Sequence, residues 1–222
     1  MKRILLTGLI LVSMPFLGLV EATPAVEATA GFDEGIEYQV IDPPQATGDP
    51  KHVEVVELFW YGCPHCYQLE PLLAGWLKNK PADVDFVRMP AILGPRWELL
   101  TRAYYTAELL GVTDEIHQPL FAAIHDKRRA FRNEDDLAKF FAEHGVDEKA
   151  FRDTYNSFGV AAKVNRSREM TKRYGITGVP TMVVNGKYRT SASTAGSHEL
   201  MLTVVDKLVA QEREALAKAD AQ

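Results

Sequence analysis

The chain has 222 residues, a hydrophobic content of 46% and a formal net charge of -5. This apolar content is enough to bury one well-formed core, and it excludes a disordered or collagen-like chain. Because the net charge is small and negative, we expect no nucleic-acid partner. Length and composition together predict one globular domain with room for an inserted subdomain.

The N-terminus has the pattern of an export signal. Lys2 and Arg3 precede an uncharged, mostly apolar run over 4–20, and small residues follow at candidate cleavage positions around Ala22 and Ala30. This pattern predicts a signal peptide over residues 1–22, with the cleavage site between 22 and 30. The apolar run is of marginal length for spanning a bilayer, so an uncleaved membrane anchor is the alternative.

The segment that follows is predicted to contain strands and one helix. Residues 31–50 are rich in Pro and Gly and contain one possible short strand over 37–41. Residues 53–60 form an apolar run broken by Glu57, which predicts a central strand buried on both faces. Helical spacing of Leu and Trp predicts a helix over 66–78, kinked at Pro71. Alternation of apolar and polar residues predicts the next strand over 84–88.

From 97 to 173 the pattern changes to amphipathic helices. Helical periodicity predicts helices over 97–110, 114–126, 134–143, 148–155 and 160–174. Asp114 and Asp147 are the expected N-caps, and Gly111 and Gly145 are the expected helix ends.

After Gly175 the strand signals return. Strands are predicted over 181–184 and 187–190, joined by the hairpin signal Asn185-Gly186. Ser197 is expected to cap a last helix that runs to about 217. The order of elements predicts an α/β fold interrupted by an all-helical insertion.

The most specific motif is Cys63-Pro64-His65-Cys66, which holds the only two cysteines of the chain. A pair at this spacing, behind a strand and at the start of a helix, indicates a thioredoxin-type redox motif. Its disulfide closes a loop too short to remove much chain entropy from the unfolded state, so a structural disulfide is the weaker interpretation. A structural zinc site is excluded because the chain has no second cysteine pair. We therefore expect no metal and no dissociable cofactor.

The position of the motif also predicts its reactivity. If the helix begins at Pro64, Cys63 is its N-cap, and the sulfur faces free backbone N–H groups and the positive end of the helix dipole. His65 adds an imidazole that can donate a hydrogen bond or carry a charge. These effects favour the Cys63 thiolate, whereas Cys66 is expected to be more buried, with a pKa closer to that of an ordinary thiol. A stabilised thiolate stabilises the reduced protein, which makes the disulfide an oxidant.

Two segments resemble a known family. They are residues 57–70, Glu-Leu-Phe-Trp-Tyr-Gly-Cys-Pro-His-Cys-Tyr-Gln-Leu-Glu, and residues 178–188, Gly-Val-Pro-Thr-Met-Val-Val-Asn-Gly-Lys-Tyr. Together they resemble the DsbA family of exported thiol:disulfide interchange proteins. The resemblance implies a thioredoxin-like fold with an inserted all-helical domain. The expected boundaries are 36–95 and 175–222 for the thioredoxin-like domain and 96–174 for the insertion.

The resemblance also implies roles for residues near the motif. Pro180 is expected in the cis form against the disulfide, with the backbone of Val179 pairing with an extended substrate. Glu57 is expected to be a buried acid that exchanges a proton with Cys66; the alternative is a Glu57 turned to solvent at a strand edge. Arg88 falls where the family has a basic partner for this acid, and an arginine keeps the charge but cannot relay a proton as a lysine can.

Aromatic residues flank the motif on its N-terminal side. We expect Trp60 and Tyr61 to lie near an apolar substrate surface. The alternative is that both are ordinary core residues, which is the role expected of Trp97.

These expectations converge on a periplasmic disulfide oxidase. It would donate the Cys63–Cys66 disulfide to reduced, unfolded exported proteins and be reoxidised by a DsbB-like membrane quinone reductase. We expect a monomer. One alternative is an exported reductase or isomerase that is kept reduced, although isomerases of this fold usually carry an extra dimerisation domain for which this chain has no room. The other is a peptide-binding chaperone in which the cysteines matter little.

Overall fold

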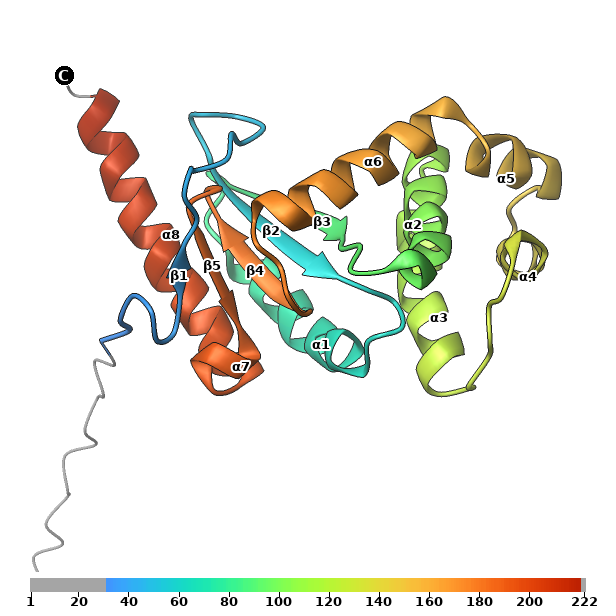
Figure 1. The fold of residues 1–222 in the computed structure, drawn as a ribbon, viewed down its shortest axis with the longest axis horizontal. Coiled ribbons are helices and arrows are strands. Elements are labelled where there is room, and N and C mark those ends of the chain that lie inside the picture. The colour runs from blue at the N-terminus through green and yellow to red at the C-terminus, as the bar shows by residue number, and fades with distance from the viewer. Residues whose placement is uncertain (1–30, 221–222) are drawn as a thin grey trace, which may run out of the picture. The chain divides into compact units, whose positions relative to one another are not determined.

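The computed structural model of the protein describes residues 31–220, so the predicted signal peptide lies outside the described residues. Within that range, no helix has the length and apolar character that crossing a membrane requires. The described chain combines one mixed sheet, helices on both faces of the sheet, and a group of helices inserted between two strands (Figure 1).

The sheet has five strands in the order β1-β5-β4-β2-β3. β2 and β3 are parallel, and the other neighbouring strands pair antiparallel. Every predicted strand is present, with small shifts at the ends; the bounds are Gln39–Val40 (β1), Val53–Phe59 (β2), Val84–Pro90 (β3), Thr181–Val184 (β4) and Tyr188–Ser191 (β5).

The turn between β4 and β5 confirms the hairpin prediction. Asn185 and Gly186 have φ values of 51° and 63°, the left-handed backbone that a tight hairpin turn requires. A Cβ at Gly186 would collide with the backbone oxygen of Gln45, so this position has to be glycine. The buried carboxylate of Glu212 accepts hydrogen bonds from Asn185 Nδ2 and Lys187 Nζ, both at 2.6 Å. These bonds fasten the hairpin to the C-terminal helix.

Two helices cover one face of the sheet. They are α1 (Pro64–Asn79) and α8 (His198–Asp220), with the short α7 (Ala192–Ala195) before the second. Ser197 accepts a hydrogen bond from the Leu200 N–H at 3.1 Å, as expected of a cap. Apolar residues of α1 and α8 pack against Val53 and Val55 of β2. Trp76 Nε1 also donates to Asp206 at 2.6 Å, which joins α1 to α8.

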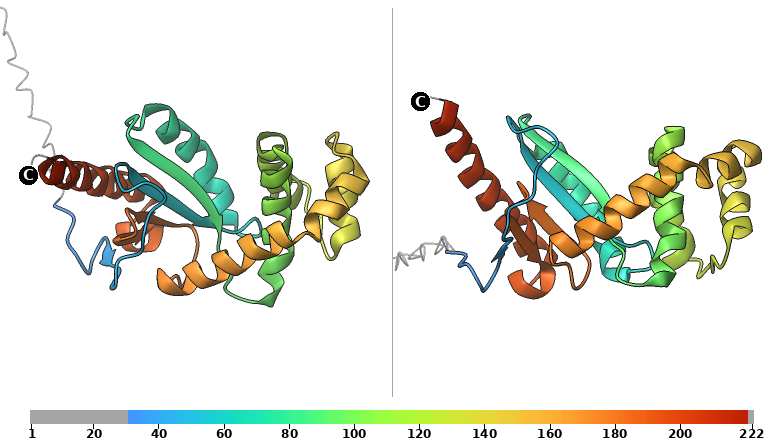
Figure 2. Two further views of the ribbon diagram at one scale, coloured as in Figure 1. Left: turned by 90° about the horizontal axis from the view of Figure 1, so that it is seen from above. Right: turned by 45° about the horizontal axis from the view of Figure 1, so that its top comes forward.

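The inserted helices, called the helical insert below, are α2 (Glu98–Leu110), α3 (Thr113–His125), α4 (Glu134–Glu143), α5 (Glu148–Tyr155) and α6 (Phe158–Arg173). A short 3₁₀ turn, Pro95–Trp97, leads into them. Both views of Figure 2 show α2 to α5 gathered beyond one end of the sheet. All the predicted helices are present. The residue boundaries of the two expected domains stay a prediction.

The helix ends confirm most of the capping predictions. Asp147 caps α5 by accepting from the Ala150 N–H at 2.8 Å, and Gly111 ends α2 in the left-handed conformation. The prediction for Asp114 was wrong, because α3 begins at Thr113 with Val112 as its N-cap. Asp114 lies instead in the first turn, where its negative charge is favourable beside the helix dipole.

The last helix of the insert belongs to two cores. Val160 and Val164 of α6 pack among the aromatic residues of the insert. Met170, further along the same helix, packs against Val56 and Leu58 on the sheet face opposite α1. Figure 1 shows α6 running from the insert back to the sheet.

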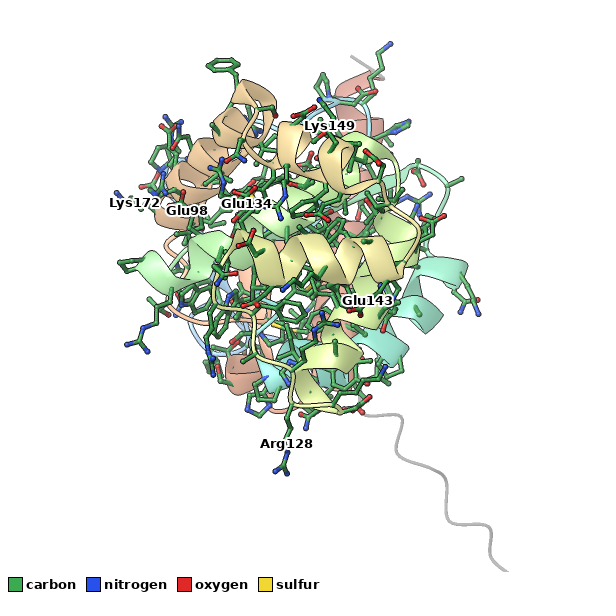
Figure 3. All side chains as sticks on the ribbon, turned by 90° about the vertical axis from the view of Figure 1, so that its right-hand side faces the viewer. Glu98, Arg128, Glu134, Glu143, Lys149 and Lys172 are labelled. Carbon is green, nitrogen blue, oxygen red and sulfur yellow. The ribbon has the colours of Figure 1, made fainter. Side chains whose placement is uncertain are left out.

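The outer side of the insert is covered by charged side chains. Figure 3 shows Glu134, Glu143 and Lys149 on this side, and Glu134 pairs with Arg152 at 3.4 Å. The inner side is apolar and shares one cluster with Phe59, Tyr61 and Cys66. The motif therefore lies where the sheet, α1 and the insert meet.

Candidate active site

The redox motif forms the turn between β2 and α1. The Cys63 N–H donates to the Trp60 oxygen at 2.9 Å, which closes the turn. A Cβ at Gly62 would collide with the Trp60 indole, so only glycine fits there. Cys63 has an extended backbone and is the N-cap of α1, with Pro64 at the first helical position, as predicted. The helix continues through Pro71 to Asn79.

Cys63 is the more accessible and more acidic thiol. Its side chain is half-buried, and both cysteines are free thiols in this structure. A hydrogen bond from the Cys66 thiol is the largest cause that lowers the pKa of Cys63 to about 6. Partial burial opposes this shift, and the backbone N–H groups of Cys66 and His65 and the charge of His65 assist it. The sequence predicted that the helix N–H groups and His65 lower the pKa of Cys63, but not that the Cys66 thiol does so.

Cys66 is fully buried in the aromatic cluster of the insert. Burial raises the pKa of the Cys66 thiol, and the neighbouring Cys63 and Glu57 raise it further. The expectation that Cys66 is the more buried thiol is confirmed, but the expectation that its pKa lies closer to that of an ordinary thiol was wrong. An apolar surrounding penalises the charged form, and sequence spacing gives no measure of that penalty.

The loop before β4 lies against the motif. The Val179–Pro180 peptide bond is cis, as expected. The Cys63 thiol donates to the Val179 oxygen at 3.3 Å, which places this loop beside the reactive sulfur. Pro180 is buried and Val179 is half-buried. Next to them lies a pocket of about 370 Å³, whose lining includes Val179, Pro180, His65, His198 and the hydroxyl-bearing residues Thr177, Thr181, Ser191 and Ser193.

The two aromatic residues before the motif have different positions. Tyr61 is 1% exposed and its hydroxyl hydrogen-bonds to His117 Nδ1 at 2.9 Å. It is a core residue and cannot form part of a substrate surface, so that expectation was wrong for Tyr61. Trp60 is half-buried and stacks on Trp97 with ring centroids 4.4 Å apart. A contact between Trp60 and substrate stays a prediction.

Glu57 is a buried acid beneath the motif. It is 0% exposed, and Arg88 Nε donates to its Oε2 at 3.2 Å. The alternative of a solvent-facing Glu57 is therefore excluded. Burial, followed by the negative charge of Glu70, raises the pKa of Glu57 to about 8, although Arg88 acts in the opposite direction. At neutral pH, Glu57 is mostly protonated.

Arg88 joins Glu57 to a second buried acid, Glu70. Arg88 Nη2 donates to Glu70 Oε2 at 3.1 Å. Glu70 also has two contacts from α3, one from His117 Nε2 at 3.1 Å and one from Gln118 Nε2 at 2.5 Å. Although burial opposes it, the hydrogen bond with His117 and the charge of Arg88 hold the pKa of Glu70 below its ordinary value. The buried cluster therefore joins β2, β3, α1 and α3.

A second contact between α1 and α3 lies beside the motif. The Tyr67 hydroxyl donates to Asp126 Oδ2 at 2.7 Å, and the Tyr67 ring stacks on His125 at 5.1 Å. His125 Nε2 in turn hydrogen-bonds to the Tyr61 backbone oxygen at 2.8 Å.

Among residues 31–220, no three His, Cys, Asp or Glu side chains are placed to hold a metal ion.

Comparison with known proteins identifies the family of this chain. The family model described as "DSBA-like thioredoxin domain" matches residues 54–203, from β2 through the insert to α8. The chain belongs to the DsbA family.

Other members are similar over most of the chain. The thiol:disulfide interchange protein DsbA of Pseudomonas aeruginosa is 40% identical over 218 residues, which cover 98% of this chain and 100% of that protein. The crystal structure of P. aeruginosa DsbA has a TM-score of 0.80 and 42% identity, covering 83% of this chain and 96% of that one. The oxidoreductase DsbA from Xylella fastidiosa has a TM-score of 0.75 and 34% identity, covering 80% and 96%.

As a DsbA-family protein, the chain is a thiol:disulfide oxidoreductase with a thioredoxin-like fold. Two residues of its buried cluster were missed from the sequence. Glu70 follows the buried Cys66 by one helical turn and so lies on the same face of α1, which is a signal that could have identified it. His117 comes from the insert, and no local pattern places it beside Glu70.

Proposed function

We propose that this DsbA-family protein is a periplasmic disulfide oxidase. It donates the Cys63–Cys66 disulfide to reduced exported proteins, and a DsbB-like membrane quinone reductase restores the disulfide. The observation that carries the proposal is the difference between the two thiols, because the pKa of Cys63 is lowered to about 6 while that of the buried Cys66 is raised.

The lowered pKa favours oxidation of substrates. The ordinary pKa of the thiol is 9.0 here and the shifted value is about 6. At pH 7 this stabilises the reduced protein by about 1 kcal/mol, after allowing for partial exposure, which corresponds to roughly 20 mV for a two-electron couple. Because the pKa is depressed, the stabilisation is complete only above pH 9 and fades as the pH falls through 6.

The reaction begins at the accessible sulfur. A substrate thiolate attacks Cys63 Sγ, the disulfide breaks, and Cys66 leaves as a thiolate that takes a proton from Glu57. A second substrate thiolate then attacks the substrate sulfur of the mixed disulfide, and Cys63 leaves as a thiolate. The substrate has gained a disulfide and lost two electrons, which the protein now holds as Cys63 and Cys66 in reduced form. The quinone of the membrane partner accepts these electrons.

The loop before β4 provides the substrate site. The Val179 backbone oxygen lies 3.3 Å from Cys63 Sγ, close enough for an extended peptide to pair with this loop while its cysteine reaches the sulfur. Pro180 shapes the loop, and the adjoining pocket receives a neighbouring substrate side chain between His65 and His198. Trp60 is the remaining aromatic candidate for substrate contact.

The deciding experiment is the equilibrium potential of the Cys63/Cys66 couple in glutathione buffers at pH 7. A potential above about -150 mV is expected, at the oxidising end of the thioredoxin-fold range. A value near -250 mV would make this an exported reductase. Full suppression of aggregation by a Cys63→Ser, Cys66→Ser variant, without any oxidation of peptides, would favour the chaperone interpretation.

A further inference from the structure

The buried cluster beneath the motif has two carboxyl groups, one guanidinium and the imidazole of His117. The exposed fractions are 0% for the Glu57 side chain, 2% for Glu70 and 19% for Arg88. Two carboxylates around one guanidinium would leave an uncompensated negative charge in the core, which is strongly unfavourable. One of the acids therefore holds a proton, and the surrounding hydrogen-bond donors determine which acid it is.

The donors are distributed unequally. Glu70 receives hydrogen bonds from Arg88, His117 and Gln118. Glu57 receives one, from Arg88, and its Oε1 atom is buried without a hydrogen-bond partner among residues 31–220. Because hydrogen bonds to a carboxylate favour its charged form, this arrangement puts the negative charge on Glu70 and the proton on Glu57.

His117 is the buried donor from the insert. Burial lowers the pKa of His117, which favours the neutral ring, in which only one nitrogen carries a hydrogen. The ionised Glu70 can only accept, so that nitrogen is Nε2, 3.1 Å from Glu70 Oε1. Nδ1 then accepts from the Tyr61 hydroxyl at 2.9 Å. The hydrogen-bonded series Tyr61–His117–Glu70 thus connects the turn after β2, through α3, to α1.

We propose that His117 is a positioning residue that keeps the negative charge on Glu70 and the proton on Glu57. This inference rests on the proposed function, in which Glu57 supplies a proton to the Cys66 thiolate when the disulfide opens. Without the His117 hydrogen bond, Glu70 competes for the proton, Arg88 pairs with an ionised Glu57, and the leaving Cys66 thiolate meets a carboxylate instead of an acid.

A packing role is the competing explanation. The His117 ring contacts Phe59 and Phe121 edge-on, with centroids 5.4 and 5.2 Å away. If packing were its only role, an aromatic ring without the nitrogen atoms would leave the proton on Glu57. The polar and titratable groups that face His117 come from every neighbouring element; they are Tyr61, Glu70, Arg88, Tyr104 and, on its own helix, Asp114.

The test compares matched variants in the oxidised, full-length protein. The variant Tyr61→Phe, His117→Phe removes the His117 donor without leaving the Tyr61 hydroxyl unpaired, and Tyr61→Phe alone is its control. His117→Gln is the rescue variant, because a glutamine amide can reach the Nε2 position and donate to Glu70. The protonation of Glu57 is followed from pH 5 to 10 by its infrared C=O band, which is assigned by its loss in Glu57→Gln.

The expected result is a titration of Glu57 that moves to lower pH by about one unit or more in the double variant, since the lost bond is to a charged group. His117→Gln should titrate like the wild type. The rate at which a small thiol opens the disulfide at pH 7.5 should fall several-fold in the double variant relative to Tyr61→Phe. An unchanged Glu57 titration in a folded double variant would overturn the inference.

Gln118→Leu is a second variant, which tests the inference even if the double variant does not fold. Gln118 is exposed, so its replacement removes a donor from Glu70 without disturbing the core, and a smaller shift of Glu57 in the same direction is expected. No shift in this variant counts against the inference. The experiments distinguish failure of the two proposals. A low redox potential of the wild-type protein would contradict the oxidase proposal. The infrared titration would still show whether Glu57 or Glu70 holds the proton.

Discussion

Glu57 on β2 lies directly opposite Arg88 on β3 in the parallel ladder, and the two side chains form an ion-pair contact at 3.2 Å beneath the redox motif. The register of two strands thus sets the position of a buried acid relative to the guanidinium that pairs with it. β2 ends at Phe59, and the turn that follows carries Cys63. The same strand therefore positions the acid and delivers the reactive sulfur.

The buried acid should make stability depend on pH. The pKa of Glu57 rises from 4.5 to about 8 on folding, so its contribution is fully present below pH 4.5 and is lost as the pH rises through 8. Relative to Glu57→Gln, the wild type should lose on the order of 3 kcal/mol of unfolding free energy between pH 4.5 and 7. Urea titrations of both proteins across this range measure the difference. A difference independent of pH would mean that Glu57 is ionised in the fold.

The second thiol should control the acidity of the first. Because the Cys66 thiol is the largest cause of the low pKa of Cys63, Cys66→Ala should raise that pKa by about one to two units. The thiolate absorbance at 240 nm, followed from pH 4 to 10, gives the value directly. His65→Leu should produce a smaller rise, since His65 contributes less. Equal effects of the two changes would contradict this ranking.

The tight turn before the motif should tolerate no side chain. In Gly62→Ala the new methyl group meets the Trp60 indole, which is held by stacking on Trp97, so a loss of about 1–3 kcal/mol of unfolding free energy is expected. Gly75 is a matched control within α1, because a Cβ there meets nothing within 4 Å. Gly75→Ala should gain about 0.5–1 kcal/mol from helix propensity alone. Urea unfolding of both variants decides the comparison.

The two cysteines should have unequal roles in catalysis. Cys63→Ser should abolish oxidation of a reduced dithiol peptide, because the accessible sulfur is lost. Cys66→Ser keeps the Cys63 thiol, and in the presence of a disulfide-containing peptide it should form a mixed disulfide that persists. Mass spectrometry of the protein–peptide adduct distinguishes the variants. An adduct on Cys66 in Cys63→Ser would reverse the assignment.

Local patterns predicted most of the fold. Apolar runs and helical spacing identified the strands and helices because each element follows its own periodicity. The turn at Asn185-Gly186 and the cap at Asp147 were predictable because specific residues suit those backbone positions. The start of α3 was missed because Asp114 suits the first turn of a helix as well as its cap.

The site was predicted less completely, for a different reason. The motif and the acid at Glu57 are adjacent along β2 and α1, so the sequence identified them. Tyr61 also flanks the motif, yet its side chain lies in the core. The packing of the insert determines which side chains of this turn are buried, and the local sequence does not show that packing. His117 lies 47 residues from Glu70, and only the packing of α3 on α1 joins them.

The position of α6 connects the insert to the loop beside Cys63. Val164 is anchored in the insert and Met170 on the sheet, and the chain leads directly from the end of this helix to Val179. One helix thus spans both cores, and the loop that follows it brings the Val179 oxygen to 3.3 Å from Cys63 Sγ. A shift of the insert relative to the sheet would be transmitted through α6 to the loop beside Cys63. If substrate binds this loop as proposed, the position of the insert and the space beside the Cys63 sulfur are coupled.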